Sequence, residues 1–380
     1  MNLQASDTSA YPTLGFPTHY TAIVERMNQI DPLAYSKTRN FIDGAVTYLS
    51  PYISRGVISV KQIKEAVLQR GYKTYQIEKF IQELAWREYF QRVWQHVGEN
   101  IWTDMKRPQP DVLHQEMLAA VDDASTGITA IDQAIHNLYN TGYMHNHVRM
   151  YTAGLVCNMA KAHWLTPSQW MYYHLLDGDI ASNNCSWQWV AGAFSSKQYI
   201  FNQENVNKYT FSNQRHSFVD KGYEDIQEMD VPAVLQPTTK LSLHTTLPVT
   251  ALPVLDTSKP TLIYNSYNLD PLWRKGQDVN RILLLEPSNF EKYPVSQKVL
   301  QFIIDLSNNI NGIQIFTGEI TEVVNLYAGT SLTEHNGIIS KEHPAFRAYP
   351  GVKDSRDWMF GEAKGYYQSF FSFYKRVQRS

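Results

Sequence analysis

Residues 177–189 read Asp-Gly-Asp-Ile-Ala-Ser-Asn-Asn-Cys-Ser-Trp-Gln-Trp and hold two acids, two adjacent amides and two tryptophans. Carboxylates suit ribose hydroxyls or a cation, and amides suit the edge of a heterocycle. Indole rings suit stacking or electron transfer. No other stretch of the chain gathers so many groups of this kind, so this segment is the first candidate for a functional site.

The elements around this segment are predicted to be mainly helical. Between residues 20 and 215, apolar residues recur at helical spacing, as in Val60-Ile63-Val67 and Ile131-Ala134-Ile135-Leu138. A further run, Phe80-Leu84-Trp86-Tyr89-Phe90-Val93, shows the same periodicity. We therefore expect a mainly α-helical domain over residues 1–220.

The second half of the chain has a different pattern. Residues 221–258 are rich in Pro and Thr and predict an extended linker. From residue 259 to 380, short apolar runs at 261–264, 282–285 and 313–316 predict buried strands around a helix at 295–306. This order predicts a small α/β domain with a parallel sheet. The domain contains neither Gly-x-Gly-x-x-Gly nor a phosphate-binding Gly-Lys-Ser/Thr loop.

Composition narrows the class of protein. The two cysteines, Cys157 and Cys185, are too few for a disulfide framework and favour a reducing, cytoplasmic location. The first residues do not resemble a secretory signal, and no apolar run is long enough to span a membrane. The formal net charge of −2 argues against a protein that coats DNA, although a local basic rim is compatible with it. His145 and His147 diverge on a helix, so we expect no metal site.

The segment 177–189 resembles the flavin-binding core of the photolyase/cryptochrome family, which carries Asp-Gly-Asp-x-x-x-Asn-Asn-x-x-Trp-Gln-Trp. Five motifs in family order extend the resemblance over residues 30–215. It implies a photolyase-type helical domain that binds FAD. Asp177 and Asp179 then match acids at the flavin ring edge and at its adenosine half, and Asn183 matches the residue that faces flavin N5. A neutral amide there suits a fully reduced flavin.

The first motif comprises Tyr35 and the run Thr47-Tyr48-Leu49-Ser50-Pro51, which is similar to the family's Thr-Ser-Arg-Leu-Ser-Pro but one residue shorter. The resemblance implies that Tyr35, Thr47, Leu49 and Ser50 help to hold the flavin and its diphosphate. Hydroxyls and N–H groups at a helix start suit an anion. Taken alone, Ser50 would be interpreted as a helix N-cap.

The second motif is Glu83-Leu84-Ala85-Trp86-Arg87, in which Glu83, Trp86 and Arg87 share one helix face. The resemblance implies that Glu83 and Trp86 meet damaged bases and that Glu83 and Arg87 lie by the flavin. A Glu83–Arg87 salt bridge on an amphipathic helix is the alternative.

The third motif is residues 141–150, similar to Thr-Gly-Trp-Met-His-Asn-Arg-x-Arg-Met. It implies that Asn146 and Arg149 bind the cofactor, that Arg149 pairs with Asp177, and that Met150 joins Trp189 in a lesion pocket. His147 replaces an arginine that often contacts DNA phosphate, which weakens the case for DNA.

The last motif is a tryptophan relay. Trp187 matches the flavin-proximal tryptophan of the family, and Trp164 matches the middle one. Pro108 falls near the position of the outer tryptophan, for which Trp102 or a tyrosine could substitute. The alternative is that both indoles only fill the core.

Together the resemblance implies that reduced FAD, excited by blue light, splits cyclobutane pyrimidine dimers in DNA. A cryptochrome-like photoreceptor that signals to a protein partner is the main alternative, and a flavoprotein scaffold without light chemistry is the third. Family members carry an α/β antenna domain before the helical domain. The α/β domain here is therefore either a reduced, relocated antenna domain with a second chromophore, or a cover for the helical core.

Overall fold

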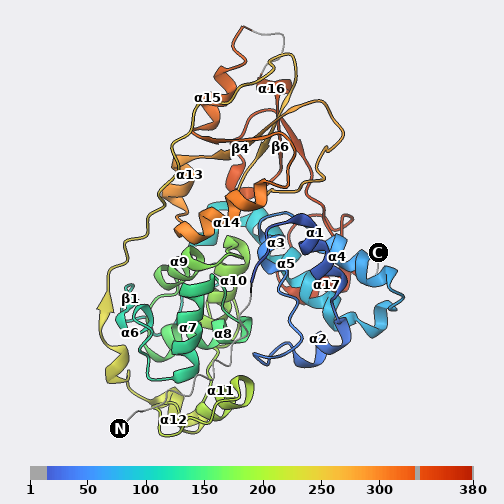
Figure 1. Cartoon of the computed structure of the whole chain (residues 1–380). Coiled ribbons are helices and arrows are strands. Elements are labelled where there is room, and N and C mark those ends of the chain that lie inside the picture. Colours follow the sequence, from blue (N-terminus) through green and yellow to red (C-terminus); the bar gives the residue numbers. More distant parts are fainter. Residues whose placement is uncertain (1–14, 330–333, 379–380) are drawn as a thin grey trace, which may run out of the picture.

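The computed structural model describes residues 15–329 and 334–378 and contains a helical part and an α/β part (Figure 1). The α-helices of the helical part are α1 (Tyr20–Asn28), α2 (Pro32–Thr38), α3 (Ser50–Ser54), α4 (Val60–Gln69), α5 (Glu78–Val97), α6 (Ala119–Asp122), α7 (Thr129–Thr141), α8 (Asn146–Gly154), α9 (Leu165–His174), α10 (Ile180–Ala191), α11 (Gln203–Thr210) and α12 (Tyr223–Glu228). A π-helical turn, η3 (Leu155–Met159), continues α8, and short 3₁₀ turns lie at η1 (Thr74–Gln76), η2 (Gly98–Trp102), η4 (Ala233–Leu235) and η5 (Pro344–Phe346).

The helical periodicities in the sequence correspond to buried helix faces. α4 buries Val60, Ile63 and Val67, and it begins at a capping box in which Ser59 and Gln62 satisfy each other's backbone N–H groups. α7 buries the predicted apolar stripe, and Gly142 ends it in the left-handed conformation that favours glycine. These elements are confirmed as predicted.

α10 lies at the centre of the helical part. It packs against α5, α8 and α9, and nine of its twelve residues are buried. Its polar residues Asn183, Asn184 and Gln188 are therefore inside the protein. Buried amides require hydrogen-bond partners, and these partners fix their orientation.

The α/β part contains one five-stranded parallel sheet with the order β5-β4-β3-β6-β7. Its strands are β3 (Thr261–Tyr264), β4 (Asn280–Leu285), β5 (Ile313–Thr317), β6 (Ile338–Lys341) and β7 (Val352–Asp354), and its helices are α13 (Pro287–Lys292), α14 (Gln297–Ser307), α15 (Ile320–Asn325) and α16 (Glu334–Gly337). The predicted parallel sheet is confirmed. The chain adds strands outward from β3 in one direction and then in the other, so a topological switch point lies between β3 and β6.

The segment between the two parts runs along the outside of the helical part (Figure 1). Residues 221–258 begin with α12 and include β2 (Thr238–Thr239), which pairs antiparallel with β1 (Met117–Leu118). Residues 240–258 contain no regular element.

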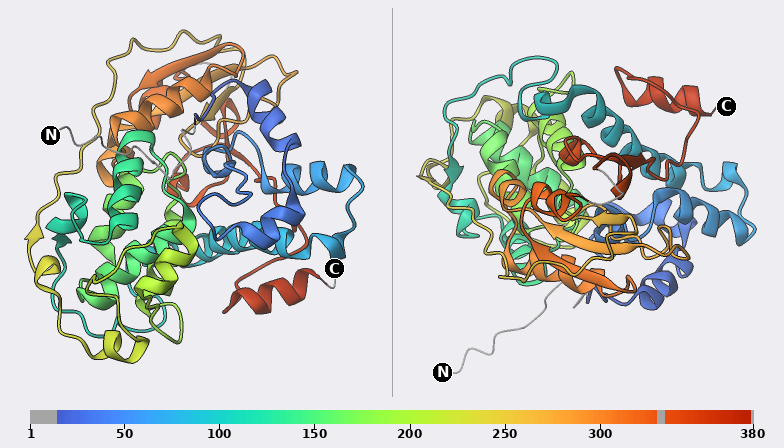
Figure 2. Two further views of the ribbon diagram at one scale, coloured as in Figure 1. Left: turned by 60° about the horizontal axis from the view of Figure 1, so that its bottom comes forward. Right: turned by 90° about the horizontal axis from the view of Figure 1, so that it is seen from above.

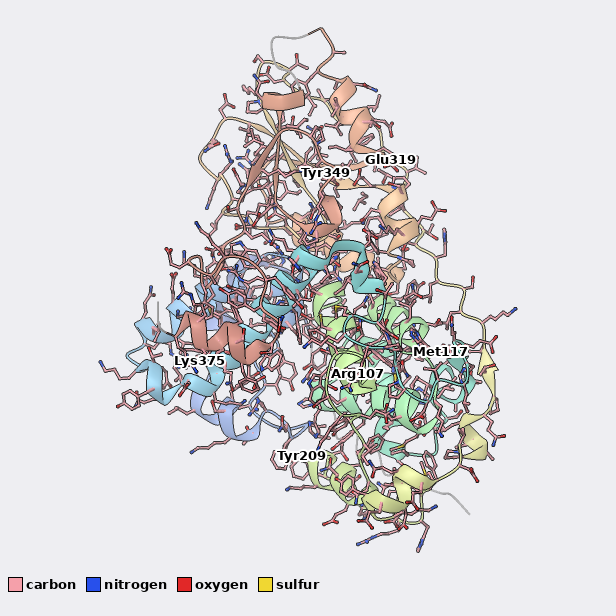
Figure 3. The ribbon with its side chains drawn as sticks, turned by 180° about the vertical axis from the view of Figure 1, so that it is seen from behind. Arg107, Met117, Tyr209, Glu319, Tyr349 and Lys375 are labelled. Carbon is pink, nitrogen blue, oxygen red and sulfur yellow. The ribbon has the colours of Figure 1, made fainter. Side chains whose placement is uncertain are left out.

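After β7 the chain returns to the helical part. There α17 (Phe370–Val377), the red helix beside the C-terminus in Figure 2 and the helix of Lys375 in Figure 3, packs against α5. Glu88 on α5, 2% exposed, anchors this segment because its carboxylate accepts the backbone N–H groups of Met359 and Phe360.

The two parts are joined through buried polar contacts. The guanidinium of Arg55 is fully buried, and it donates to the carbonyls of Leu175 and Leu176 in the helical part and of Ser266 after β3. Gly56, next in the chain, has a φ of +64°, and a Cβ at this position would lie 2.3 Å from the carbonyl oxygen of Tyr267. Only glycine fits this close approach.

Candidate functional site

The loop before α10 and the first turns of α8 form an ion pair. Nη2 of Arg149 lies 3.0 Å from each carboxylate oxygen of Asp177, and Nε of Arg149 donates to the carbonyl of Met144 at 2.8 Å. The side chain of Asp177 is 5% exposed and that of Arg149 is 20% exposed. The expected Arg149–Asp177 pair is thus formed in a mostly buried setting, where a charge-assisted hydrogen bond is strong.

Asp179 lies at the start of α10 and is almost fully buried. One of its oxygens caps the helix by accepting from the N–H of Ser182 at 2.7 Å, and the other accepts from Gln91 at 2.5 Å and lies 3.6 Å from Nη2 of Arg87. Protein groups therefore contact both oxygens, and Asp179 orients α10 and Arg87.

Ser54 connects these two carboxylate sites. Its hydroxyl accepts from Nη2 of Arg87 at 2.7 Å and donates to the backbone carbonyl of Asp177 at 2.8 Å. Arg87, Asp177 and Asp179 consequently belong to one hydrogen-bond network. Ser54 and Gln91 were not predicted as site residues, because both lie on predicted helices without a motif of their own.

Asn183 has a defined amide orientation. Its Nδ2 donates to the carbonyl of Ser168 on α9 at 2.9 Å and more weakly to Oδ1 of Asn184 at 3.3 Å. Because the carbonyl oxygen of Ser168 can pair only with a donor, the side-chain nitrogen of Asn183, and not its oxygen, points toward α9. Within the described part of the chain, its Oδ1 accepts no hydrogen bond, so this oxygen is available to an N–H donor. The hydroxyl of Ser182, one residue earlier, is likewise buried without a partner among the described residues.

The predicted diphosphate-binding residues lie on α2 and around the start of α3. The ring of Tyr35 meets Phe80 edge-on at 5.2 Å, and burial, with Glu83 second, raises the pKa of its hydroxyl. Thr47 accepts from the N–H of Leu49 at 3.4 Å. Ser50 is the first residue of α3 and makes no capping bond, so the N-cap interpretation of Ser50 is wrong. Tyr48, in the shortened loop, has a φ of +54°.

Glu83 does not pair with Arg87. Its carboxylate lies 3.2 Å from Arg39 on the turn after α2 and 3.0 Å from Lys79 one turn earlier on α5. Arg87 faces Asp179 instead. Glu83 and Arg87 thus have different partners, which excludes a Glu83–Arg87 salt bridge as the reason for this motif.

Residues 80–247 match the family model described as the FAD-binding domain of DNA photolyase. The matched residues belong to the photolyase/cryptochrome family. The chain is 30% identical to a deoxyribodipyrimidine photo-lyase of Synechococcus sp. over 47% of this chain and 40% of the relative. It is 27% identical to that of Escherichia coli over 48% of this chain and 41% of the relative. The crystal structure of a class III photolyase from Agrobacterium tumefaciens covers 50% of this chain and 42% of that chain, with 27% identity and a TM-score of 0.43. The chain thus spans less than half the length of these relatives.

The cofactor of this photolyase-type domain is FAD. The residues present fit the group. The Arg149–Asp177 pair, together with the Asn183 oxygen and the Ser182 hydroxyl that have no partner among the described residues, are donors and acceptors of the kind that a flavin ring edge requires. Among the described residues, no group of three His, Cys, Asp or Glu side chains could hold a metal ion. No helix of the described chain is long and apolar enough to cross a membrane.

The predicted lesion-pocket residues of the photolyase-type domain lie on three helices. Met150 on α8 is half-buried, while Trp189 on α10 is 40% exposed and lies 6.3 Å from the ring of Tyr199. Asn146 on α8, which was predicted to bind the cofactor, is exposed. Trp86 on α5 is half-buried, and Phe370 of α17 stacks on its ring at 3.7 Å with an interplanar angle of 10°. Phe370 was not predicted as a site residue, because α17 shows no family motif.

The predicted relay residues are buried in one core cluster. Trp187 is 2% exposed and Trp164 is fully buried. The indole N–H of Trp164 donates to Oδ1 of Asp104 at 2.6 Å. Trp102, the suggested outer substitute, packs against the other core cluster and stacks on Tyr293 at 5.5 Å.

His147, at the position of a family arginine, lies between aromatic rings. Its imidazole is 4.9 Å from Tyr151 and 4.5 Å from Tyr209. Burial, followed by the charge of Arg39, lowers the pKa of His147 to about 4. The imidazole is neutral near pH 7, so it does not replace the positive charge of the family arginine.

A pocket of about 130 Å³ lies at the switch point of the sheet, where the α/β part meets the helical part. Its α/β wall comes from the carboxyl ends of β3 and β6 and from the segment after β7, with Asn268, Asp270, Lys341, His343, Arg356 and Trp358. Arg87 and Asp179 line the opposite wall. Both side-chain polar atoms of Asn268 are buried without a partner in the described residues. A polar ligand or ordered water suits this wall.

Proposed function

We propose that this photolyase-type flavoprotein uses blue light to split cyclobutane pyrimidine dimers in DNA by passing one electron from reduced FAD to the dimer. The observation that carries the proposal is the orientation of Asn183. Its amide nitrogen is fixed on Ser168, so its neutral oxygen is available to accept a hydrogen bond from protonated N5 of the flavin. A neutral acceptor at this position does not oppose the negative charge of a fully reduced flavin, which is the form that repair needs.

The chain's own residues then have distinct tasks. Bound FAD supplies light absorption and one-electron chemistry. Arg149 and Asp177 hold the ring edge, and Ser54 and Arg87 fix the backbone of Asp177. Glu83, Trp86, Met150 and Trp189 are proposed to receive the dimer after it leaves the DNA stack, since unstacking costs least at a damaged site.

The test is light-dependent repair of a thymine-dimer oligonucleotide by the reduced protein, followed as the recovery of intact thymine, with a dark sample as control. Asn183→Asp changes the amide to a carboxylate of the same shape. It should lower the reduction potential of bound FAD and reduce repair. Asn184→Asp, at the neighbouring position that is not assigned to flavin N5, should have smaller effects on the potential and on repair. An intact flavin without any repair of the dimer would overturn the proposal.

The second candidate is a cryptochrome-like photoreceptor, and the Trp86–Phe370 stack favours it. A ring of the protein itself occupies the face on which a damaged base would stack. The neutral His147 also removes a positive charge from the predicted DNA-facing surface. Normal flavin photochemistry together with negligible binding of both damaged and undamaged DNA would support this candidate.

The α/β domain is proposed as a reduced antenna domain because of its strand order and the polar pocket at its switch point. Ligand sites in open parallel sheets lie at such switch points. The pocket is smaller than the roughly 300–1,000 Å³ of sites that bury a whole drug-sized ligand. A second chromophore would therefore be only partly buried there. The test is to extract the pigments of the purified protein. If the extract contains no pigment besides FAD, the antenna proposal fails and the α/β domain serves only to cover the helical core.

A further inference from the structure

Trp164 is a buried indole with an acidic partner. Its ring is fully buried, and its Nε1–H donates to Oδ1 of Asp104 at 2.6 Å. The indoles of Trp273 and Trp358 also donate to carboxylates, so the bond of Trp164 gains its meaning from the place of this residue in the predicted relay. An indole that loses an electron becomes a much stronger acid at this nitrogen. A carboxylate at hydrogen-bond distance is then placed to take the proton.

Neighbouring groups hold the side chain of Asp104 in place. Oδ2 accepts from the backbone N–H of Gln109 at 2.8 Å, and Nε2 of His163 lies 3.3 Å from Oδ1. Nδ1 of His163 accepts from the N–H of Leu165, which places the ring proton of a neutral imidazole on Nε2, toward Asp104. Gln109 also accepts from the backbone N–H of Trp164, so the indole and its acceptor are held by one framework.

The loop that carries Asp104 also lacks the outer tryptophan. Pro108, at the expected position of that residue, is exposed and lies four residues after Asp104. Trp102 is stacked on Tyr293 in the other core cluster. The ring neighbour of Trp164 on this side is His163, at 5.7 Å. On the loop that is expected to carry the outer tryptophan, the group that contacts Trp164 is therefore the carboxylate of Asp104.

We propose that Asp104 is the proton acceptor that ends the electron relay at Trp164. The inference rests on the proposed electron transfer. One electron leaves Trp164 through Trp187 for the photoexcited, oxidised flavin. The Nε1–H bond of Trp164 breaks, and an O–H bond forms on Oδ1 of Asp104, which leaves a neutral indolyl radical beside a carboxylic acid. An external thiol later returns one electron, and the proton goes back to Nε1. Loss of the proton from Trp164 slows the return of the electron from the flavin. In a relay of three tryptophans, electron transfer from the outer tryptophan would have the same effect.

Cys157 does not compete for this role. It is fully buried on the π-helical turn η3, and burial, followed by the charge of Asp104, raises the pKa of its thiol. The thiol is protonated at neutral pH and is a poor proton acceptor. The carboxylate of Asp104 is the basic group that directly contacts the indole.

Asp104→Asn tests the proposal because the amide oxygen can still accept from the indole but cannot hold its proton. After a light flash on the oxidised protein, transient absorption distinguishes the cationic from the neutral tryptophan radical. The parent should show the neutral radical, and Asp104→Asn should keep the cation about a hundredfold longer. Asp230→Asn, which removes an equal charge at an exposed position, should behave like the parent.

A second readout needs no flavin. The indole N–H resonance of Trp164, assigned with Trp164→Phe, should lie downfield in the parent and move upfield in Asp104→Asn, because an amide oxygen is the weaker acceptor. An unmoved resonance would show that the bond is not made. If Trp164→Phe slows photoreduction but Asp104→Asn leaves the radical neutral at the parent rate, Asp104 is not the acceptor although the relay stands. If Trp164→Phe has no effect, the relay itself fails.

Discussion

Trp86 and Phe370 stack face to face, although 284 positions of the 380-residue chain separate them. Their ring centroids are 3.7 Å apart, and Phe370 is 2% exposed. Trp86 comes from the motif that is predicted to meet damaged bases, while Phe370 comes from the C-terminal helix. The same indole face cannot stack on both partners, so DNA bound as proposed would have to compete with α17 for it.

This competition predicts that Phe370→Ala strengthens binding of a dimer-containing oligonucleotide. An aromatic pair contributes about 0.5–1.5 kcal/mol beyond its buried area, and this cost of displacement would disappear. Phe371→Ala is the matched control, because Phe371 is 70% exposed and meets Trp86 only edge-on at 6.5 Å. Oligonucleotide titrations at two salt concentrations measure the effect. Equal affinities of the parent and Phe370→Ala would show that Trp86 does not stack on the lesion.

Once Phe370→Ala has removed the competing ring, Trp86→Ala should weaken binding of the dimer-containing oligonucleotide. In the Phe370→Ala background it should cost about 1–3 kcal/mol of lesion affinity, the usual contribution of a base–aromatic stack. FAD content should stay unchanged, because Trp86 is assigned to the lesion and not to the cofactor. Loss of FAD in this variant would contradict that assignment.

Asp177→Ala should weaken FAD retention. Its removal leaves the guanidinium of Arg149, whose side chain is 20% exposed, without its charged partner beside the flavin. An unsatisfied charged hydrogen bond costs about 1–3 kcal/mol, or roughly a tenfold to hundredfold loss of affinity. Equilibrium dialysis of released FAD measures the change. Asp123→Ala, at an exposed position, serves as the control, and an equal loss in both variants would contradict the assignment.

Trp187→Phe should abolish most photoreduction of oxidised FAD by external reductant, since phenylalanine keeps an aromatic ring but not the easily oxidised indole. Trp164→Phe should slow it as well. Trp170→Phe is a suitable control, because Trp170 is equally buried but donates to the hydroxyl of Tyr139 and belongs to no relay motif. Absorption spectra during constant blue illumination give the rates, and parent-like rates in both relay variants would exclude the relay.

Stability should fall between pH 6.5 and 4. Burial, with His147 and Arg149 as smaller causes, lowers the pKa of His145 to about 4, and burial together with Arg39 does the same for His147. Above pH 6.5 both imidazoles are neutral in the folded and unfolded states. Below it the unfolded chain binds protons first, so the free energy of unfolding falls by up to about 1.4 kcal/mol per pH unit for each histidine. Denaturant titrations of the parent and His147→Gln at pH 7 and pH 5 should show a smaller drop in the variant.

Much of the fold follows from periodicity in the sequence. The stripes that became α4, α7 and α14 are long enough to show their helical spacing, and β3, β4 and β5 are continuous apolar runs. β6 and β7 were not predicted, because β6 ends in the polar residues Ser340 and Lys341 and β7 has only three residues, so neither is a continuous apolar run. α17 was not predicted, because only its packing against α5 explains the aromatic residues on its buried face.

The candidate site likewise combines contacts that the sequence could predict with contacts that it could not. Motif order was sufficient to pair Arg149 with Asp177 across 28 positions. It could not show that Glu83 turns to Arg39 and Lys79, since local spacing favoured Arg87. Asp104 and Phe370 acquire their relations to the predicted tryptophans only through tertiary packing, and neither lies in a motif.

The buried guanidinium of Arg55 has a consequence for folding cooperativity. It is bonded both to the chain just before Asp177 and to the turn after β3. If the sheet separated from the helices, the guanidinium of Arg55 would lose its bond to the carbonyl of Ser266 and the cover that buries it, while it stayed bonded to Leu175 and Leu176. Local opening of the α/β part is thereby coupled to the segment that carries Asp177. Amide protons on both sides of Arg55 should exchange as one unit, and binding of flavin on one side should slow exchange on the other.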